Sequence, residues 1–489
     1  MSAIRELQNY LFEQAKSYPT KPHADLFHFL SEWCVLQEAF RRARKSISNR
    51  GSGNHASEAV LRGRVDQAND FLQELGHSLL NGTYRPGKVR SYEIPKPGKP
   101  GESRRVAVLS GADKVVHHAL KIVLDPVIEA RLHRRSFAFR PGKTIWDQLH
   151  ALRKTVDQDP LRFQCGLVID IESFFDRIDH RRLLNDLGLL TNERPFTRLV
   201  KQLLNQVSAS AVGLVTKRPA GILQGSPLSP LLANWHLDSF DRNWDRQFGK
   251  TNPLFRYADD IVTLTSSKEE ANQIRKVLIR QLKESTQLSI AKKKTRITPL
   301  HEGLPILGMK LLRSHDPFLD ENRTLIITDA DRIQEAMQSA KEDIESFTAD
   351  RPLGQQFEKL NRRLRGWFQT WQFASDASSA FESIDLSIYR LVRSRLKSCL
   401  KISHAVLNEQ FSARADTGHP TWEADGVQIL MLQSLPRNFY QARQNRFPWQ
   451  DDAASPLSPV PPIRITDQSE TKTNGKMVVV SDSHAVNQS

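Results

Sequence analysis

The sequence predicts an α+β fold divided among several domains, and three observations lead to it. The chain has 489 residues, which is too long for one compact core, so roughly two to four domains are expected. Apolar residues recur at helical spacing in residues 1–80 and again after residue 330. Between these regions, short apolar runs bounded by glycine, proline and charged residues are typical of strands.

The charge balance points to a polyanionic partner. Lysine and arginine number 70 against 55 aspartate and glutamate residues, which gives a net charge of +15. Nucleic acid is the simplest partner for such a chain, although a basic balance can also serve solubility alone. The hydrophobic content of 39% is enough to bury a core.

Cysteine usage and hydropathy indicate a cytoplasmic protein that does not enter a membrane. Cys34, Cys165 and Cys399 lie far apart and form no CxxC pair, so neither a disulfide framework nor a structural zinc site is expected. No apolar run approaches the ~20 residues that cross a bilayer. The N-terminal segment "MSAIRELQNYLFEQAKSY" is charged and amphipathic and lacks a signal-peptide core.

The N-terminal part is predicted to be helical up to Leu80. The segment "LFHFLSEWCVLQEAFRRARKSI" has helical spacing and a basic end, the glycines of "SNRGSGNH" interrupt it, and a second helix runs from about Ala56. Next, "YRPGKVRSYEIPKPGKPGESRRVAVLS" predicts two short strands joined by a basic loop rich in proline and glycine. The segment "DKVVHHALKIVLDPVIEARL" predicts a helix.

Three carboxylates stand out in the middle of the chain. Asp170 breaks the apolar run of "CGLVIDIESFFDRI", which predicts a buried strand, and an isolated buried acid is costly unless something neutralises it. Asp259 and Asp260 lie at the tip of a hairpin predicted around 255–264, before an amphipathic helix over about 267–288. If the strands are neighbours, the three acids converge and suit two divalent cations about 4 Å apart. Taken alone, however, "YADD" also fits an ordinary solvated turn.

The C-terminal part is predicted to be helical, then disordered. Asp329 or Asp331 would cap the first helix, and residues 356–402 form basic helices. From Asp451 onward the chain is polar and rich in serine and proline, which is typical of disorder.

Several motifs resemble, in their order along the chain, the palm of reverse transcriptases, and in particular of bacterial group II intron-type enzymes. They are "LVIDIESFFDRIDH", "GILQGSPLSPLLANWHLDSFD", "FRYADDIVTL", "SIAKKKTRI" and "ILGMKL". Upstream, "SRRVAVLSGADKVVHHAL" and "SFAFRPGKTIWDQL" resemble the fingers, although "RRVAVLS" stands where the family usually has an arginine, a proline and Gly-Ile-Pro. The likeness covers about residues 60–312, and "LNRRLRGWFQTW" extends it into the thumb.

The resemblance implies a right-hand polymerase fold with helical N-terminal and C-terminal extensions. The implied domains are an N-terminal extension (1–59), fingers and palm (60–312), a helical thumb (313–405), a C-terminal extension (406–450) and a disordered tail (451–489).

The resemblance also implies a catalytic centre. Asp170, Asp259 and Asp260 would be the catalytic, metal-binding acids, with the backbone carbonyl of Ile171 as a further ligand. The implied cofactor is a pair of Mg²⁺ ions, which Mn²⁺ can replace.

The implied nucleotide site lies on the fingers and palm. Lys96 and Arg104 would grip the triphosphate, with Arg105 as the alternative to Arg104. Phe175 would exclude a 2′-hydroxyl by its volume, although Phe174 and Phe175 also fit two consecutive core residues. Gln224 and Gly225 would form the floor of the pocket, where a missing side chain lets the backbone approach the base pair.

Basic residues of the palm and thumb are implied to hold nucleic acid: Lys294, Arg362, Arg363 and Arg365. One of Lys292, Lys293 and Lys294 protonates pyrophosphate, or the run holds template phosphates, and both readings stay open. Trp367 and Trp371 are expected to pack the thumb core rather than to stack on bases. His117, His118 and His180 are expected to be structural.

The function implied is that of an RNA-directed DNA polymerase, a nucleotidyltransferase. Its partners would be an RNA template, expected to be a structured noncoding RNA, deoxynucleoside triphosphates and the cDNA product, with a homo-oligomer as a further option. No Cys/His array follows the thumb motif, so a retrohoming element is not expected, and antiphage defence is the favoured setting. The alternatives are a group II intron maturase and a CRISPR-associated reverse transcriptase.

Overall fold

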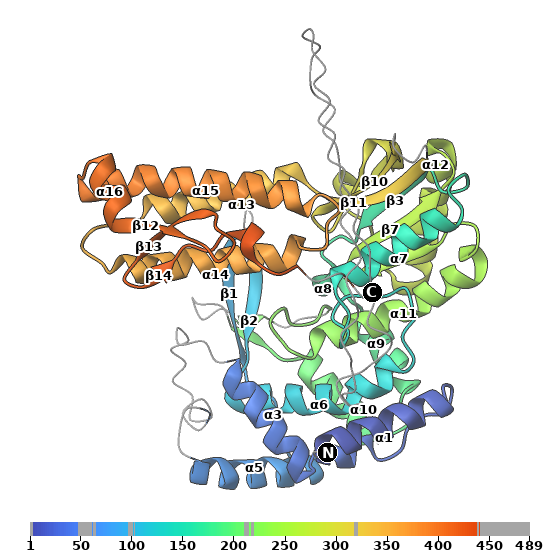
Figure 1. Cartoon of the computed structure of the whole chain (residues 1–489). Coiled ribbons are helices and arrows are strands. Elements are labelled where there is room, and N and C mark those ends of the chain that lie inside the picture. The colour runs from blue at the N-terminus through green and yellow to red at the C-terminus, as the bar shows by residue number, and fades with distance from the viewer. Residues whose placement is uncertain are drawn as a thin grey trace, which may run out of the picture.

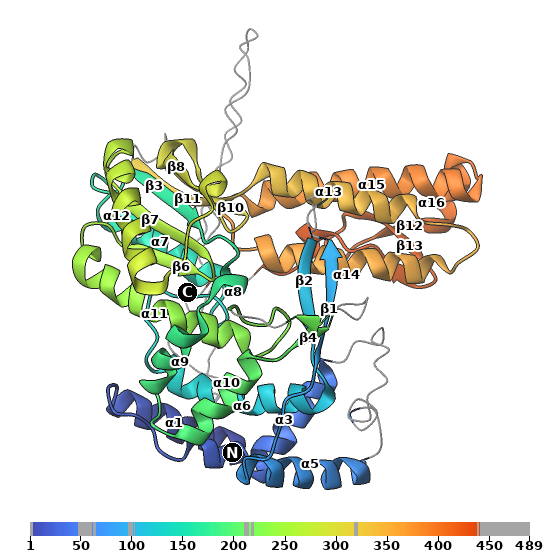
Figure 2. The same cartoon turned by 180° about the vertical axis from the view of Figure 1, so that it is seen from behind.

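A computed structural model describes residues 3–46, 61, 65–95, 101, 103–209, 215–216, 220–316, 321–437 and 440. Figure 1 shows helices at the base of the molecule, a sheet-containing body above them on one side, and a long helical arm on the other. A two-stranded ribbon rises from the base towards this arm (Figure 2). The tail predicted to be disordered, 451–489, lies outside the described residues.

The N-terminal region is helical, as predicted. Its helices are α1 (Ala3–Ser17), α2 (Leu26–Phe29), α3 (Trp33–Lys45) and α5 (Val65–Leu80). Helices α1 and α3 pack against α6 (Gly111–Glu129), which is buried over nearly its whole length, and α5 packs against α3. The amide of Gln8 on α1 donates to the carbonyl of Ile122 on α6 at 3.0 Å, which fixes the two helices against each other.

The ribbon is formed by the two strands predicted upstream of α6. Strands β1 (Val89–Pro95) and β2 (Ser103–Val108) pair antiparallel, with Ile94 opposite Arg104. The sheet order is β2-β1-β4-β5, where β4 (Ser208–Ala209) runs parallel to β1 and β5 (Val215–Thr216) is antiparallel to β4. This sheet forms the fingers.

The palm sheet has the order β6-β7-β3-β8, and its strands pair antiparallel. They are β3 (Cys165–Asp170), β6 (Leu254–Tyr257), β7 (Asp260–Thr265) and β8 (Arg296–Pro299). The predicted hairpin is therefore confirmed. Gly166 in β3 lies against β9 (Leu304–Ile306), because a Cβ atom on Gly166 would come within 2.1 Å of Leu304 Cδ2.

Helices surround this sheet: α7 (Ile145–Gln158), α8 (Phe174–Arg177), α9 (His180–Gly188), α10 (Arg194–Leu204), α11 (Ser229–Phe248) and α12 (Lys268–Thr286). The predicted amphipathic helix is α12, and Ser267 caps it by accepting from the backbone N–H of Glu270. A 3-10 turn, η1 (Lys292–Lys294), leads into β8.

A second sheet separates the palm from the thumb helices. Its strands are β9 (Leu304–Ile306), β10 (Met309–Asp316) and β11 (Glu321–Thr328), in the order β11-β10-β9. Most of β10 and β11 lies in the range predicted as helical thumb, which begins at 313. The period-two burial of β11 explains the difference, because one side of the strand packs on the core.

The thumb helices are α13 (Ala330–Glu345), α14 (Leu353–Trp371) and α15 (Ala377–Leu400). Asp329 is the cap of α13, since its side chain accepts from the backbone N–H of Asp331. These helices bury a continuous apolar core that includes Phe357 and Phe381.

The C-terminal extension was expected to be helical, and it is so only at its start. Helix α16 (His404–Phe411) is followed by β12 (Ser412–Arg414), β13 (Pro420–Ala424), β14 (Val427–Gln428) and η3 (Leu432–Ser434). Trp422 fastens this small sheet to α15, because its ring stacks on Tyr389 at 4.8 Å and its Nε1 donates to the Tyr389 carbonyl. Strands of two to five residues give little periodicity to detect in a sequence.

Candidate active site

The structure brings the three predicted acids together at one edge of the palm sheet. Asp170 is the last residue of β3 and Asp260 the first of β7, and the two are direct cross-strand partners. Asp259 lies in the tight turn between β6 and β7, and its carbonyl accepts from the backbone N–H of Ile171 at 3.1 Å. The prediction that the strands carrying Asp170 and Asp260 are neighbours in one sheet is therefore confirmed.

The turn that presents Asp259 has a strained backbone. Ala258 adopts a left-handed conformation with φ of 58°, which costs a residue other than glycine roughly 1–2 kcal/mol. The Ala258 carbonyl accepts from Arg256 Nη1 at 3.2 Å. The strain is thus offset by contacts beneath the turn.

Arg256 anchors these contacts, and the sequence analysis did not single it out. Its side chain is 0% exposed and forms a bidentate ion pair with Asp241 of α11, with the shortest N–O distance at 2.6 Å. It also donates to Asn234 Oδ1 at 3.0 Å and to Ser136 Oγ at 2.8 Å. A cation within the buried strand run "LFRY" was the available signal, because such a charge requires an acidic partner.

Burial and neighbouring negative charge raise the pKa of two of the acids, Asp259 and Asp260. Burial, together with the charges of Asp259 and Asp170, raises the pKa of Asp260 to about 7. Burial and the Asp170 charge also raise the pKa of Asp259. Clustered carboxylates of this kind fit divalent cations, which would remove the repulsion.

A lysine provides the local counter-charge. Lys294 Nζ lies 2.5 Å from Asp170 Oδ2. In the part of the chain that the structure describes, no three His, Cys, Asp or Glu side chains form a ready-made metal cluster. Lys292 and Lys293 have no such contact with an acid of this edge in the same described part, so Lys294 alone of the basic run reaches Asp170.

The backbone places the Ile171 carbonyl beside the acids. Ile171 pairs with Ile290, and the flanking bonds run from Ala291 N to Asp170 O and from Glu172 N to Ser289 O. The N–H and C=O groups of Ile171 therefore both point away from the segment 289–291 and towards the turn that carries Asp259. The Ile171 N–H donates there to the Asp259 carbonyl. This orientation fits the predicted ligand role.

The register of the fingers ribbon separates Arg104 from Arg105. Arg104 shares a face of β2 with Val106, whose Cγ1 would lie 3.0 Å from a Cβ atom on Gly225 in the palm. Arg105 points to the other face, opposite Glu93. Arg104 and Arg105 therefore lie on opposite faces of β2. The palm segment meets both faces, because Ala107 on the Arg105 face packs with Leu223. Lys96 lies outside the described residues.

Two exposed side chains on this face were missed by the sequence analysis. Tyr92 is 46% exposed and Ile94 41% exposed, and both lie on β1 opposite residues of the Arg104 face. The sequence could have indicated that Tyr92 and Ile94 share one face of the strand, because they alternate with Glu93 and alternate residues of a strand lie on the same face.

Gly225 of the palm lies directly against strand β2 of the fingers. It has φ of 104°, and a Cβ atom there would lie 2.6 Å from the Ala107 carbonyl of β2. The missing side chain therefore lets the fingers strand approach the palm, and the predicted role of Gly225 beside a base pair stays a prediction. Gln224 completes the contact, because its carbonyl accepts from the Ala107 N–H and its Nε2 donates to Asp176 at 3.2 Å.

Phe174 and Phe175 occupy different environments. Phe174 is 3% exposed and belongs to the core, whereas Phe175 is half-buried. The Phe175 ring packs edge-on against Phe174 at 5.4 Å and Phe139 at 6.4 Å. Phe175 is thus held by neighbours while part of its surface remains accessible.

The predicted nucleic-acid residues of the thumb lie on α14, and two of them are engaged. Arg363 pairs with Asp343 of α13 at 2.6 Å, and Arg365 pairs with Glu358 at 2.8 Å. Arg362 is exposed. Trp371 is 5% exposed and Trp367 packs beside it, so the expected core role of the tryptophans is confirmed.

Two of the three histidines, His117 and His180, form hydrogen bonds in the interior. His117 is buried with Nδ1 2.6 Å from Ser226 Oγ, and burial lowers its pKa to about 4. His180 Nε2 lies 2.7 Å from the Gly221 carbonyl.

Fingers, a palm with an acidic edge and a helical thumb define a right-hand, template-directed polymerase. Residues 94–311 match the family model described as "Reverse transcriptase (RNA-dependent DNA polymerase)". The chain therefore carries a reverse transcriptase domain, and by this domain it is an RNA-directed DNA polymerase.

Two curated relatives refine this assignment. The chain is 25% identical to protein YkfC of Escherichia coli over 353 residues, which cover 64% of this chain and 90% of YkfC. It is 27% identical to the group II intron-encoded protein LtrA of Lactococcus lactis over 196 residues, which cover 40% of this chain and 31% of LtrA. Over these segments the chain is similar to group II intron-encoded proteins, and it spans about a third of the length of LtrA.

A solved structure of telomerase from Candida albicans with a telomeric RNA fragment aligns with a TM-score of 0.38 and 12% identity. The alignment covers 67% of this chain and 63% of that one, a likeness too weak to add to the assignment. None of the helices that the structure describes is long and apolar enough to span a membrane.

Proposed function

We propose that the protein extends the 3′ end of a DNA strand on an RNA template, with deoxynucleoside triphosphates as substrates. The observation that carries this proposal is the cross-strand pairing of Asp170 with Asp260, with Asp259 in the adjoining turn. A polymerase of this class needs that grouping because phosphoryl transfer depends on positioning and charge stabilisation.

The acids and one carbonyl would hold the metal. Asp170, Asp259, Asp260 and the carbonyl of Ile171 would bind two Mg²⁺ ions, for which Mn²⁺ could substitute. When bound, the ions supply activation of the 3′-hydroxyl and stabilisation of the leaving pyrophosphate.

Other residues would position the nucleotide. Arg104 would bind the triphosphate from the Val106 side of β2, together with Lys96. Phe175 would pack under the sugar and offer no partner to a 2′-hydroxyl, while Tyr92 would present an aromatic surface to a base beside Arg104. Lys294, which reaches Asp170, is our candidate for the proton donor to pyrophosphate.

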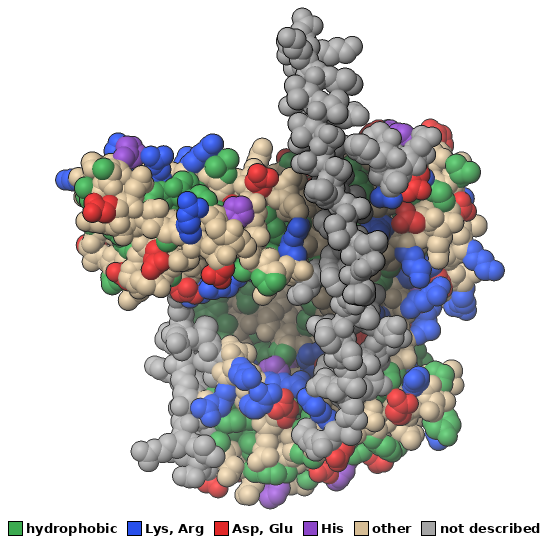
Figure 3. Space-filling view, in the orientation of Figure 1, with side chains coloured by type: hydrophobic (Ala, Val, Ile, Leu, Met, Phe, Trp, Pro, Cys, Tyr) green, Lys and Arg blue, Asp and Glu red, His purple; other side chains and the backbone are tan. Residues whose placement is uncertain are grey.

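The RNA would be held largely by charge. Lysine and arginine side chains are spread over both the body and the arm of the molecule in Figure 3. On the thumb, the exposed side chain of Arg362 could bind a phosphate directly. Arg363 and Arg365 would first have to break their ion pairs with Asp343 and Glu358.

For the biological setting we propose antiphage defence with an associated noncoding RNA, which rests on analogy. The match to LtrA favours a second candidate, a group II intron maturase that assists splicing. Sequencing the RNA that copurifies with the protein separates them, because the defence role predicts one noncoding RNA and the maturase role predicts intron RNA. Recovery of CRISPR-array transcripts would instead support a CRISPR-associated enzyme.

The catalytic assignment is tested by Asp259→Asn. We expect primer extension on RNA to be abolished, because the substitution removes a charge needed to assemble the metal pair. RNA affinity in a salt titration should change little, since the RNA-binding cations lie elsewhere. The variant should fold at least as stably as wild type, because it relieves repulsion among the acids.

Asp416→Asn is the matched control, since Asp416 is exposed in the C-terminal extension. It should extend primers like wild type. Extension by Asp259→Asn at the wild-type rate would overturn the assignment.

A further inference from the structure

A positively charged groove lies at the base of the fingers sheet, outside the acidic edge. It has a volume of about 380 Å³ and is lined by residues 85–88, by α10 and by residues 205–207. Four of the lining side chains are cations and none is a carboxylate: Arg85, Lys88, Arg198 and Lys201. We call this feature the fingers-base groove.

The two faces of α10 explain why its cations point into the groove. Phe196, Leu199, Val200 and Leu203 are buried against the body of the molecule. Arg198, Lys201 and Asn205 are exposed on the opposite side at the i, i+3 and i+7 spacing of one helical face.

The other wall is a loop with a fixed conformation. The buried carboxylate of Asp113 accepts from the N–H of Gly87 at 3.2 Å, from the Tyr84 hydroxyl and from Gln206 Nε2 at 3.0 Å. Gln206 Nε2 also donates to the Gly87 carbonyl, and Val89 N donates to the Val207 carbonyl. The two walls are therefore tied together where β1 and β4 begin to pair. Asp113 itself is 1% exposed and does not line the groove.

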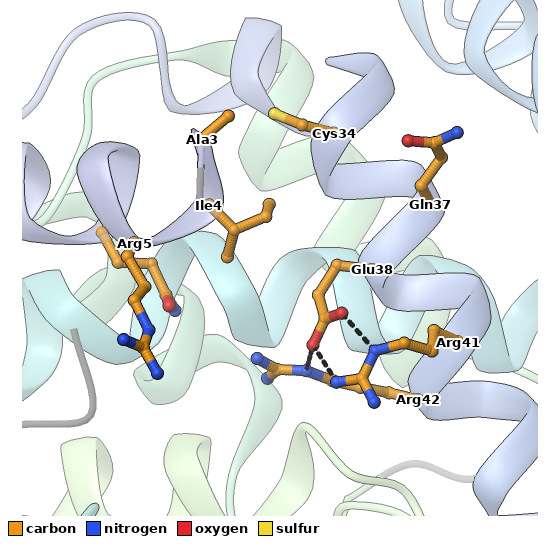
Figure 4. A pocket seen from close by; sticks show the side chains of 9 residues that line it. Ala3, Ile4, Arg5, Cys34, Gln37, Glu38, Arg41 and Arg42 are labelled. Carbon is orange, nitrogen blue, oxygen red and sulfur yellow. Dashed lines mark hydrogen bonds and ion pairs between the residues drawn. The ribbon is translucent and has the colours of Figure 1, made fainter. Parts of the chain in front are cut away.

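Three of the cations are not neutralised locally. Lys88, Arg198 and Lys201 are exposed and form no ion pair with a carboxylate of the described residues. A larger cavity of about 610 Å³ between α1 and α3 makes a contrast (Figure 4). There, Arg41 and Arg42 both bind Glu38, at 2.5 and 2.7 Å, so an anion would have to displace an existing partner.

We propose that the fingers-base groove binds the phosphate backbone of RNA away from the palm. Unpaired lysine and arginine beside amide side chains match phosphate oxygens, and the lining offers no aromatic ring for base readout. Because its cations are exposed, the groove would enclose little of a small ligand, and this favours a chain that passes through it. The proposal rests on RNA being the template.

The test is the salt dependence of equilibrium binding by the full-length double variant Arg198→Gln, Lys201→Gln. The probe is a fluorescent RNA hairpin with a long single-stranded extension. Removing two phosphate contacts should lower the slope of log K against log salt by about 1.4, at about 0.7 per contact on single-stranded RNA. Circular dichroism and the thermal midpoint establish that the variant is folded.

The matched control is Lys276→Gln, Arg280→Gln, which removes the same two charge types from the exposed side of α12. Its slope should change by less than about 0.3. Equal slopes for the groove variant and wild type, or equal losses in both double variants, would overturn the proposal. Loss of pyrophosphate binding by the groove variant with unchanged RNA binding would assign the groove to free phosphate compounds and also overturn it.

Lysine acetylation locates the contact independently. RNA should protect Lys88 and Lys201 from acetic anhydride several-fold relative to Lys276, as measured by mass spectrometry. Equal reactivity of the three lysines in the RNA complex would contradict the proposal. Both assays measure binding without polymerisation, so a failure of catalysis in wild type would count against the proposed function and not against the groove.

Discussion

The palm turn and the fingers ribbon lie on either side of the proposed nucleotide site, and they are stabilised in different ways. The palm turn rests on Arg256, which is fully buried and hydrogen-bonded to the turn and to α11. The ribbon is exposed at its tip on both strands and is held there mainly by cross-strand pairing. A two-stranded ribbon without a core is only marginally stable, so it can adjust to a substrate. The difference suggests fixed geometry for the metal-binding acids and mobility for the residues that would grip the nucleotide.

The largest expected effect is on the palm side of this comparison. Arg256→Leu leaves Asp241 buried without its cation, which should destabilise the protein by about 3–5 kcal/mol and abolish extension. The same change on the ribbon, Arg105→Leu, should cost less than about 0.5 kcal/mol. Urea unfolding followed by tryptophan fluorescence measures both.

A second substitution identifies the cause of that loss. Asp241→Leu combined with Arg256→Leu should recover part of the stability, because no unpaired buried charge remains. Equal losses for Arg256→Leu and Arg105→Leu would contradict the contrast between the two regions.

The next effect concerns the two faces of the ribbon. Arg104→Ala should raise the apparent KM for nucleotide by about 10- to 150-fold, which corresponds to about 1.5–3 kcal/mol for a lost charged hydrogen bond. Arg105→Ala should leave this KM within about twofold, because its side chain points to the other face. Steady-state extension at saturating template measures both. If Arg105→Ala raises the KM and Arg104→Ala does not, Arg105 rather than Arg104 binds the triphosphate.

The smallest expected effect is on sugar selection. Phe175→Ala should reduce the preference for deoxynucleotides by about 10- to 100-fold, because it opens space for a 2′-hydroxyl without adding a partner. Extension with each nucleotide set, followed by alkaline cleavage of the product, measures the preference. Phe139→Ala is the control, since it removes only the neighbouring ring. Unchanged selection in active Phe175→Ala protein would exclude the gate.

The sequence predicted the acidic edge because a local signal marks each of its parts. Asp170 interrupts an apolar run and Asp259 and Asp260 sit at a hairpin tip, so pairing the strands was enough to bring them together. Arg256 was missed because its partner, Asp241, lies on a helix whose packing the sequence does not reveal. The Arg363 pair with Asp343 was missed for the same reason.

Other errors arose where local patterns are short or ambiguous. The C-terminal sheet has strands of two to five residues, and it is stabilised by Trp422 against Tyr389, a contact between distant parts of the chain. The approach of the Ala107 carbonyl to Gly225 was also not foreseen. Such contacts depend on tertiary packing rather than on local sequence.

The most direct test of the central claim is a count of Mn²⁺ ions bound at the palm edge. Electron paramagnetic resonance would titrate Mn²⁺ into the protein with an RNA–DNA primer–template and a chain-terminated primer, so that no turnover occurs. Wild type and Asp416→Asn should bind about two ions per chain. Asp170→Asn and Asp259→Asn should each lose at least one of them, and equal numbers and affinities in all four proteins would contradict the account.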